Sequence, residues 1–419
     1  MSTIFLIIGI IGIGILWFFI SWRCTSKNRK QWKEYQGPDL PVGVNLEIYQ
    51  LWTDDGYRLQ IFHVRDEDHH DSDLRPVIMH HNQGGSAEYW LTQGGKKSPA
   101  AILAGEGYDV YLTNARGNPY SYGHAKYETN SNEFFDFSFQ QMKYDIKANL
   151  EFVLKHSGKD KVHYIAHSEG ATTVMAALAD PSREIGQFIE EHLITFYAFA
   201  PVIYMKNTNM ACKLYLGQFV FPPFRALMSL LGIYSMNPKT QKNGWLKTQF
   251  LELLIWLESK VTTKDAADLE ALQSLIRHSI PGYGVSFQQL AHFLQGYSGK
   301  GDVKNFKKYD YGRKINLERY GTEEPPRYDL ALVKSKIVLY YVESDVFIKS
   351  ESVEYLKEEL SNADVEVVYK EGWNHGTFLA PKDIETFYRN LISGEKSERE
   401  LHELVSSKRE RGDEMENLL

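Results

Sequence analysis

Short apolar runs alternate with amphipathic stretches along most of the chain, and this alternation predicts a mostly parallel β-sheet with helices on both faces. Residues 45–53 and 57–64 are strand-like and flank a hairpin turn at Asp55-Gly56. Residues 140–156 have apolar positions at helical spacing. Runs typical of buried strands occupy residues 76–82, 108–116, 162–166, 193–201, 336–344 and 365–372.

The alternation stops between residues 203 and 334, where apolar-rich helical stretches such as 213–234 and 245–258 take over. This region is too long for a loop within a compact domain, so it should be a substructure of its own. We therefore expect one α/β domain with an inserted, mainly helical cap. The expected segments are an anchor at 1–22, a basic linker at 23–41, core at 42–202, cap at 203–334, core at 335–394 and a charged tail at 395–419.

Residues 4–22 carry no charge, and as a helix they would span about 28 Å at ~1.5 Å per residue. The hydrocarbon core of a bilayer is about 30 Å thick, so a transmembrane anchor is expected. No basic residue precedes the run and no small-residue cleavage site follows it, which favours an anchor over a signal peptide; a buried core helix is the third reading.

The basic residues that follow the apolar run place the body of the protein on the cytosolic side by the positive-inside rule. They are Arg23, Lys27, Arg29, Lys30 and Lys33. A single-pass membrane protein with a cytosolic body is therefore expected, and a lumenal, lysosomal or secreted location is the alternative. Cys24 could be palmitoylated at the membrane edge, although an ordinary free thiol is the simpler explanation.

Composition narrows the class of protein. The chain has 419 residues, a net charge of −7, 24% charged and 13% aromatic residues, which exclude disordered, collagenous and low-complexity proteins. Its mild acidity argues against a nucleic-acid partner. Cys24 and Cys212 are the only cysteines, so a disulfide-stapled scaffold is excluded. The last residues, E-M-E-N-L-L, resemble a dileucine sorting signal, a match that also arises by chance.

The strongest chemical signal is Ala166-His167-Ser168-Glu169-Gly170, between an apolar strand and a helix rich in small residues. A nucleophilic serine on a tight strand-to-helix turn requires this context. The alternative is a serine that happens to lie in a turn.

A serine hydroxyl is a weak nucleophile and needs a base and an orienting acid. Asp345 follows the strand at 336–344, and His375 lies 30 residues later, just after the strand at 365–372. In α/β-hydrolases the order is Ser, then Asp or Glu, then His, and all three lie at strand ends. Ser168, Asp345 and His375 are therefore the predicted catalytic residues.

A tetrahedral intermediate also needs hydrogen-bond donors for its oxyanion. The expected donors are the backbone N–H groups of Glu169 and of Gln83, in the Gly-rich loop after the strand at 76–82. No metal site or organic cofactor is expected. His80-His81 and His69-His70 are adjacent pairs, and the two members of each pair should point to opposite faces of a strand, which argues against a metal site at either pair. The chain has no Walker motif and no G-x-G-x-x-G.

Several separated blocks of the sequence resemble the acid lipases, a family that includes gastric lipase, lysosomal acid lipase and yeast steryl ester hydrolases. N-A-R-G-N-P-Y-S-Y-G-H at 114–124 resembles the family's N-x-R-G-N-x-x-S-x-x-H. The other blocks are residues 134–153, 164–173, 306–330 and 372–378. The resemblance covers about residues 40–388.

The resemblance implies an α/β-hydrolase fold, with the nucleophile at Ser168, the acid at Asp345, the base at His375 and the oxyanion donors at Gln83 and Glu169. This chain departs from the family pattern at three positions: Ala166 replaces a Gly, Asn82 replaces a Gly, and Glu169 replaces a Gln. The backbone donors should survive these changes, since Asn tolerates left-handed backbone angles. The lid disulfide of secreted relatives is absent, because Cys212 has only Cys24 as a possible mate.

The resemblance also implies that the cap covers the serine. Its apolar residues would suit a lipid acyl chain, although most of them could instead form the cap's own core. They include Phe219, Phe221, Phe224, Leu227, Leu230 and Leu231.

We therefore expect a serine carboxylic ester hydrolase that cleaves triacylglycerol or steryl ester at a membrane or lipid-droplet surface. The alternatives are a catalytically silent, lipid- or partner-binding hydrolase-like protein, or a thioesterase or peroxidase-like enzyme on the same fold. Protein partners are unknown.

Overall fold

The computed structural model describes an α/β core and parts of the segment inserted into it. The described residues are 44–66, 74–91, 98–129, 131–205, 211–230, 234–235, 284–296, 305–342, 345, 347–379, 381 and 383–392. The expected anchor, basic linker and charged tail lie outside these residues, as do Cys24 and the dileucine-like end. Among the described residues, no helix is long and apolar enough to cross a membrane.

The described part of the chain forms an eight-stranded sheet in the order β1-β2-β4-β3-β5-β6-β7-β8. The pairs β1–β2 and β2–β4 are antiparallel and the remaining neighbours are parallel, so the predicted mostly parallel sheet is confirmed. The strands are Val44–Trp52, Arg58–Asp66, Val77–His80, Val110–Thr113, Val162–His167, Leu193–Phe199, Lys336–Val342 and Asp364–Lys370, numbered β1 to β8 along the chain.

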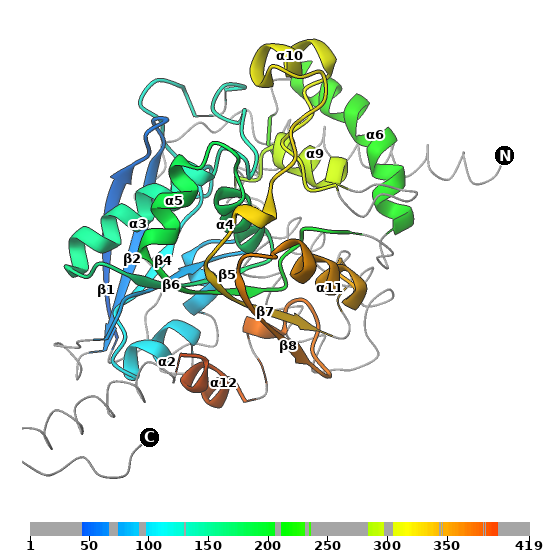
Figure 1. The fold of residues 1–419 in the computed structure, drawn as a ribbon. Coiled ribbons are helices and arrows are strands. Elements are labelled where there is room, and N and C mark those ends of the chain that lie inside the picture. The colour runs from blue at the N-terminus through cyan, green and yellow to red at the C-terminus, as the bar shows by residue number, and fades with distance from the viewer. Residues whose placement is uncertain are drawn as a thin grey trace, which may run out of the picture.

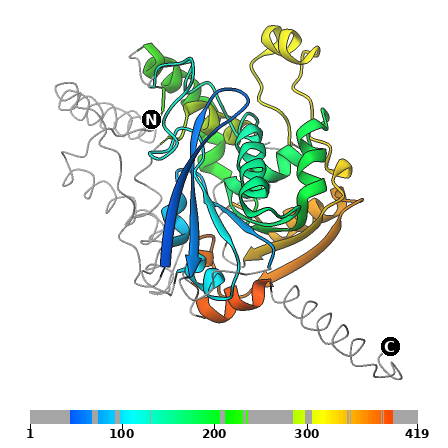
Figure 2. The same cartoon turned by 90° about the vertical axis from the view of Figure 1, so that its left-hand side faces the viewer.

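Burial along the strands follows their place in the sheet. Every residue of β3, β4 and β5 is buried, since these central strands are covered on both faces. The edge strand β8 has no buried residue, and each of its positions is either exposed or half-buried. The sheet is strongly twisted, and β1 and β2 at one edge run in a different direction from β7 and β8 at the other (Figure 2).

Helices cover both faces of the sheet (Figure 1). The helices α3 (Lys143–Ser157), α4 (Glu169–Leu178) and α5 (Glu184–His192) pack against one another on one face. The helices α2 (Pro99–Gly105) and α12 (Ile384–Leu391) pack together on the other. Every residue of α4 is buried, because its small side chains allow close contact with β5, α3 and α5.

Further elements are α11 (Ser350–Glu359), which lies between β7 and β8, and three short 3-10 helices. The 3-10 helices are η1 (Ala87–Leu91), η3 (Leu330–Leu332) and η4 (Thr377–Leu379).

Three described α-helices lie between β6 and β7, in the segment expected to be an insertion. They are α6 (Ala211–Leu230), α9 (Phe287–Gly296) and α10 (Arg313–Tyr320). Helices α6 and α9 pack against each other beyond the end of the sheet (Figure 1). The boundaries that we expect for the cap stay predictions.

Helix α6 exposes several large apolar side chains. Phe219 is 64% exposed, Leu230 is 85% exposed and Leu227 is also exposed, whereas Phe221 and Phe224 are partly buried against Phe287 of α9. Leu231 lies outside the described residues. Three of the apolar residues singled out from the sequence therefore face outward rather than into a core.

Candidate active site

Ser168 lies on a strained turn between the end of β5 and the start of α4. Its φ of 55° and ψ of −119° are unusual for a residue with a side chain. The Ser168 N–H donates to the carbonyl oxygen of Phe199 at 2.9 Å, which ties the turn to the end of β6. Backbone strain of this kind persists only where neighbouring structure enforces it, and it is frequent at functional sites.

The residues on either side of Ser168 fit the turn for different reasons. A Cβ atom at Gly170 would lie 2.4 Å from the His81 carbonyl oxygen, so only glycine fits there without movement. Ala166 is fully buried within β5, opposite His80 and Ala198 of the neighbouring strands. The departure from Gly at position 166 is thus accommodated in a regular strand.

His375 and Asp345 lie within hydrogen-bond distance of the serine. The His375 Nε2 atom is 2.9 Å from Ser168 Oγ, and its Nδ1 atom is 2.8 Å from Asp345 Oδ2. Asp345 is 1% exposed, and its other oxygen accepts the N–H groups of Phe347 and Ile348. The structure therefore brings the three predicted residues together in the order that nucleophilic catalysis requires, with the imidazole between hydroxyl and carboxylate.

His167, which the sequence did not single out as a functional residue, contacts the backbone of the segment that carries His375. Its Nε2 atom lies 2.8 Å from the His375 carbonyl oxygen, which can only accept, so Nε2 carries the proton. The Tyr89 hydroxyl can therefore donate to the His167 Nδ1 atom. Burial lowers the pKa of His167 well below its usual value, so the ring stays neutral. Its position next to Ser168 was the only sequence signal.

The loop after β3, which carries Gln83, is fixed by His81. The His81 Nδ1 atom donates to the Asn82 carbonyl oxygen at 2.7 Å, and Nε2 accepts the Ala115 N–H at 3.1 Å. Asn82 is not among the described non-glycine residues with positive φ, whereas Gly84 has a φ of 70°. The Gly-to-Asn departure at position 82 therefore needs no left-handed backbone.

The expectation that His80 and His81 point to opposite faces of a strand is wrong. Strand β3 ends at His80, so His81 is already outside it, and the two rings stack with centroids 5.2 Å apart. Thr113 Oγ1 is 2.9 Å from His80 Nδ1. Residues His69 and His70 lie outside the described residues.

Glu169 follows Ser168 in the sequence and is buried, with 3% of its surface exposed. Its Oε1 atom accepts the side-chain amides of Gln83, at 3.3 Å, and Gln289, at 3.2 Å. Burial raises the pKa of this carboxyl to about 7, against the smaller lowering effect of the two amides. The two residues expected to supply oxyanion donors are therefore linked through their side chains.

Helix α9 is firmly attached to the core beside this carboxyl. The Ser286 hydroxyl donates to the Phe137 carbonyl oxygen, and His292 Nδ1 lies 2.9 Å from Ser138 Oγ. The His292 ring also stacks on Phe139, with centroids 3.8 Å apart and planes at 8°. A cavity of about 580 Å³ lies next to α9, and its walls include Phe139, Val202 and Phe293.

The family-like block at 114–124 has a structural role at Arg116. This buried guanidinium donates to both oxygens of Asp55, at 2.6 and 2.9 Å, and to Asp145 of α3 at 2.7 Å. It also lies 4.0 Å from the centre of the Tyr57 ring. Arg116 thus joins the β1–β2 turn, the segment after β4 and α3.

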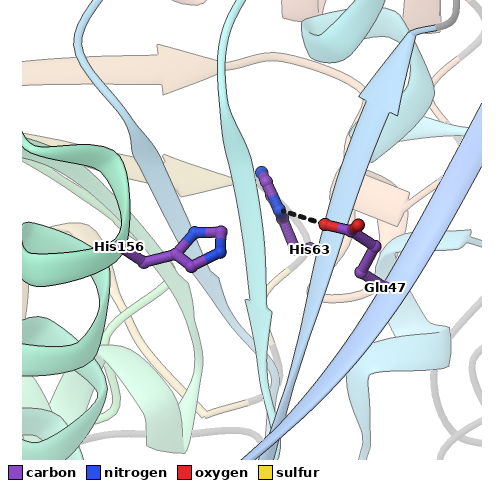
Figure 3. Close-up of side chains that lie close together, drawn as sticks. All are labelled: Glu47, His63 and His156. Atoms are coloured by element: carbon purple, nitrogen blue, oxygen red, sulfur yellow. Dashed lines mark hydrogen bonds and ion pairs between the residues drawn. The ribbon is translucent and has the colours of Figure 1, made fainter.

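A second group of titratable side chains lies between β1, β2 and α3 (Figure 3). Glu47, His63 and His156 offer ligand atoms within 4.8 Å of one another, a spacing at which a metal ion must be considered. The His63 ring, however, contacts Glu47 at Nδ1, at 3.3 Å, and Asp109 at Nε2, and the cationic Arg65 is 3.2 Å from Nε2.

Both His156 ring nitrogens also have partners. Nδ1 lies 2.9 Å from the hydroxyl of Tyr111, and Nε2 lies 3.1 Å from the hydroxyl of Tyr49. The group is therefore a hydrogen-bonded network that joins the sheet to α3.

Comparisons with known proteins place the sequence among hydrolases. Residues 75–189 match the model of the α/β-hydrolase fold family, and residues 41–94 match that of a partial α/β-hydrolase lipase region. The chain is 30% identical to gastric triacylglycerol lipase of Mus musculus and 29% identical to that of Bos taurus. Each alignment covers 84% of this chain and 88% of the relative.

Solved structures agree on the fold. A soluble variant of the monoglyceride lipase of Saccharomyces cerevisiae, in complex with a substrate analogue, superposes with a TM-score of 0.51 at 16% identity. The match covers 87% of this chain and 99% of that one.

Proposed function

The chain belongs to the acid lipase family of α/β-hydrolases and is a carboxylic ester hydrolase, and on this premise we propose that it cleaves water-insoluble lipid esters through an acyl-enzyme on Ser168. The observation that carries the proposal is the continuous hydrogen-bonded series from Ser168 through His375 to Asp345.

The proposed reaction begins when Ser168 Oγ attacks the ester carbonyl carbon and His375 Nε2 accepts the hydroxyl proton. Asp345 holds the Nδ1–H tautomer and stabilises the imidazolium that forms. The backbone N–H groups of Gln83 and Glu169 would bind the oxyanion, and His375 then returns the proton to the leaving alcohol. Water, activated by the same imidazole, would release the fatty acid, so no metal or organic cofactor is needed.

The proposal extends to the class of lipid ester that the enzyme cleaves. Relatives named triacylglycerol lipases make an acylglycerol the first substrate to test, and steryl ester is the second. The outward-facing Phe219 and Leu230 of α6 support contact of this helix with a lipid surface.

The test compares trioleoylglycerol with cholesteryl oleate, using Ser168→Ala as the blank. We expect hydrolysis of one or both by the wild type and a loss of at least about a thousandfold in Ser168→Ala. Unchanged hydrolysis in the variant would refute the assignment. Labelling by a fluorophosphonate probe that depends on Ser168 would exclude a catalytically silent protein, and faster turnover of acyl thioesters than of either oxygen ester would favour a thioesterase.

We also propose that residues 4–22 anchor the protein in a membrane, with its body in the cytosol, where the enzyme is held close to membrane or droplet substrate. The uncharged run and the five basic residues after it support this topology. Protease treatment of intact vesicles should then digest the body, and a protected body would contradict the topology.

A further inference from the structure

Glu169 stands at the end of α4 where the oxyanion of the proposed reaction is expected. Glu169 is the first residue of α4 and follows Ser168 directly, and its side chain is almost fully buried. The N-terminus of a helix favours one nearby negative charge. If the reaction generates an oxyanion there, a carboxylate at Glu169 would compete with that oxyanion for the same helix end and would repel it.

Two amides from different parts of the molecule meet on this carboxyl. Gln83 comes from the loop after β3, and Gln289 comes from α9 of the inserted segment. The orientation of the Gln289 amide is fixed, because its oxygen accepts the Ser286 N–H at 2.8 Å and its nitrogen therefore faces Glu169. The carboxyl is thus the point at which the expected oxyanion loop and α9 are joined.

The charged and titratable groups around Glu169 do not compensate a carboxylate. Lowered pKa values keep His80 and His81 neutral on the β3 side and His292 neutral on α9. On α3, Asp145 is paired with Arg116, and on the serine side the His375 imidazole is paired with Asp345. Within the described part of the chain, the recorded hydrogen-bond partners of the Glu169 carboxyl are the two neutral amides.

We propose that the Glu169 side chain is a positioning residue that joins the oxyanion loop to α9 and supports catalysis in its neutral form, while its ionised form slows the reaction. The proposal rests on the proposed function, because it requires an oxyanion beside the first turn of α4.

Because it is buried, the Glu169 carboxyl changes its ionisation state near neutral pH. The raised pKa of Glu169, about 7, means that the carboxyl is mostly neutral at pH 6 and mostly ionised at pH 8. Activity should therefore fall as the pH rises through the range in which Glu169 ionises. The substitution Glu169→Gln keeps the size and hydrogen-bonding capacity of the side chain and introduces the residue found in the acid lipase pattern.

The experiment measures kcat/KM for a soluble ester, p-nitrophenyl butyrate, between pH 5 and pH 9 in the full-length protein. For Glu169→Gln we expect the fall above pH 7 to disappear, so that the ratio of variant to wild-type activity rises about tenfold between pH 6 and pH 9. Glu184→Gln, at the first residue of α5 and exposed, is the matched control and should follow the wild-type profile.

A second variant tests the link itself. Gln289→Leu removes one amide that favours the ionised carboxyl, so in an otherwise wild-type chain the fall in activity at alkaline pH should move to higher pH. The same substitution in the Glu169→Gln background should cause no such shift. Parallel profiles for wild type and Glu169→Gln, or an unmoved fall in Gln289→Leu, would overturn the inference. Failure of the proposed function would be separate, since Ser168→Ala would then retain activity at every pH.

Discussion

At the scale of single residues, the site depends on backbone conformations that the ends of the strands enforce. Ser168 and Ala200, with φ values of 55° and 46°, directly follow β5 and β6. The N–H of each donates to the next strand, Ser168 to Phe199 and Ala200 to Tyr340. Sparsely populated backbone conformations of this kind cost about 1–3 kcal/mol each, which the surrounding sheet offsets.

Gly170→Ala should damage the site without removing any functional group. The added methyl would lie 2.4 Å from the His81 carbonyl oxygen and would push α4 away from the loop after β3. We expect a loss of about 1–3 kcal/mol in the free energy of unfolding and at least a tenfold loss in kcat. Urea unfolding and ester hydrolysis measure the two effects.

Gly105→Ala is the matched control, since a Cβ there would meet only Asp66 Oδ2 at 3.6 Å, an ordinary contact. Wild-type activity in Gly170→Ala would mean that the fit between α4 and the loop is not required.

The proximity of Ser168, Asp345 and His375 could be predicted because each follows a strand, and parallel strands end at one edge of a sheet. Their catalytic roles stay a prediction. The contacts of His167 with His375 and of Gln289 with Glu169 could not be foreseen, because they join segments 208 and 120 residues apart whose approach depends on packing. The prediction that His80 and His81 point to opposite faces was wrong because the residue at which a strand ends is poorly marked in the sequence.

At the scale of elements, Arg116 determines how α3 meets the sheet. The guanidinium is 1% exposed and the Asp145 carboxylate is fully buried, so neither can exchange its partner for water. Burial raises the pKa of Asp145, against the lowering effect of Arg116. The sequence block around Arg116 resembled a family motif, and its observed contacts are structural ones.

Replacing Arg116 with Ala should cost about 3–5 kcal/mol in the free energy of unfolding, because Asp145 would be left buried without its partner. The double variant Arg116→Ala/Asp145→Asn should recover part of that loss, since the remaining side chain is neutral. Denaturant unfolding of the single and double variants measures the coupling.

Arg313→Ala serves as the control for that cycle. Its partner Glu323 and Arg313 itself are exposed, so its loss should cost less than about 1 kcal/mol. A similar small cost for Arg116→Ala would show that the buried ion pair does not hold α3 in place.

At the scale of the whole molecule, several buried histidines make stability depend on pH. Burial lowers the pKa of His80 and His167 well below normal, of His81 to about 4 and of His292 to about 3. The unfolded chain binds protons at these four sites below about pH 6.5, whereas the folded chain does not. Acidification should therefore favour unfolding.

Two buried carboxyls act in the opposite direction. The pKa values of Glu169 and Asp145 are raised, so the folded chain binds protons at these sites that the unfolded chain releases. The four histidines outnumber the two carboxyls, so the folded chain binds fewer protons than the unfolded chain as the pH falls, and each unmatched proton is worth about 1.4 kcal/mol per pH unit.

We expect the free energy of unfolding to be at least about 2 kcal/mol lower at pH 5 than at pH 7, measured by urea unfolding at both values. Equal or greater stability at pH 5 would contradict this linkage.

The position of the insertion has a consequence for biosynthesis. The ribosome makes Ser168 177 residues before Asp345 and 207 before His375, and the inserted segment between β6 and β7 is synthesised in between. The serine can gain its base only after β7 and β8 have joined the sheet, late in translation. Reaction of a nascent chain with a fluorophosphonate would then report the completion of folding, and a growing polypeptide would not hydrolyse ester before it is finished.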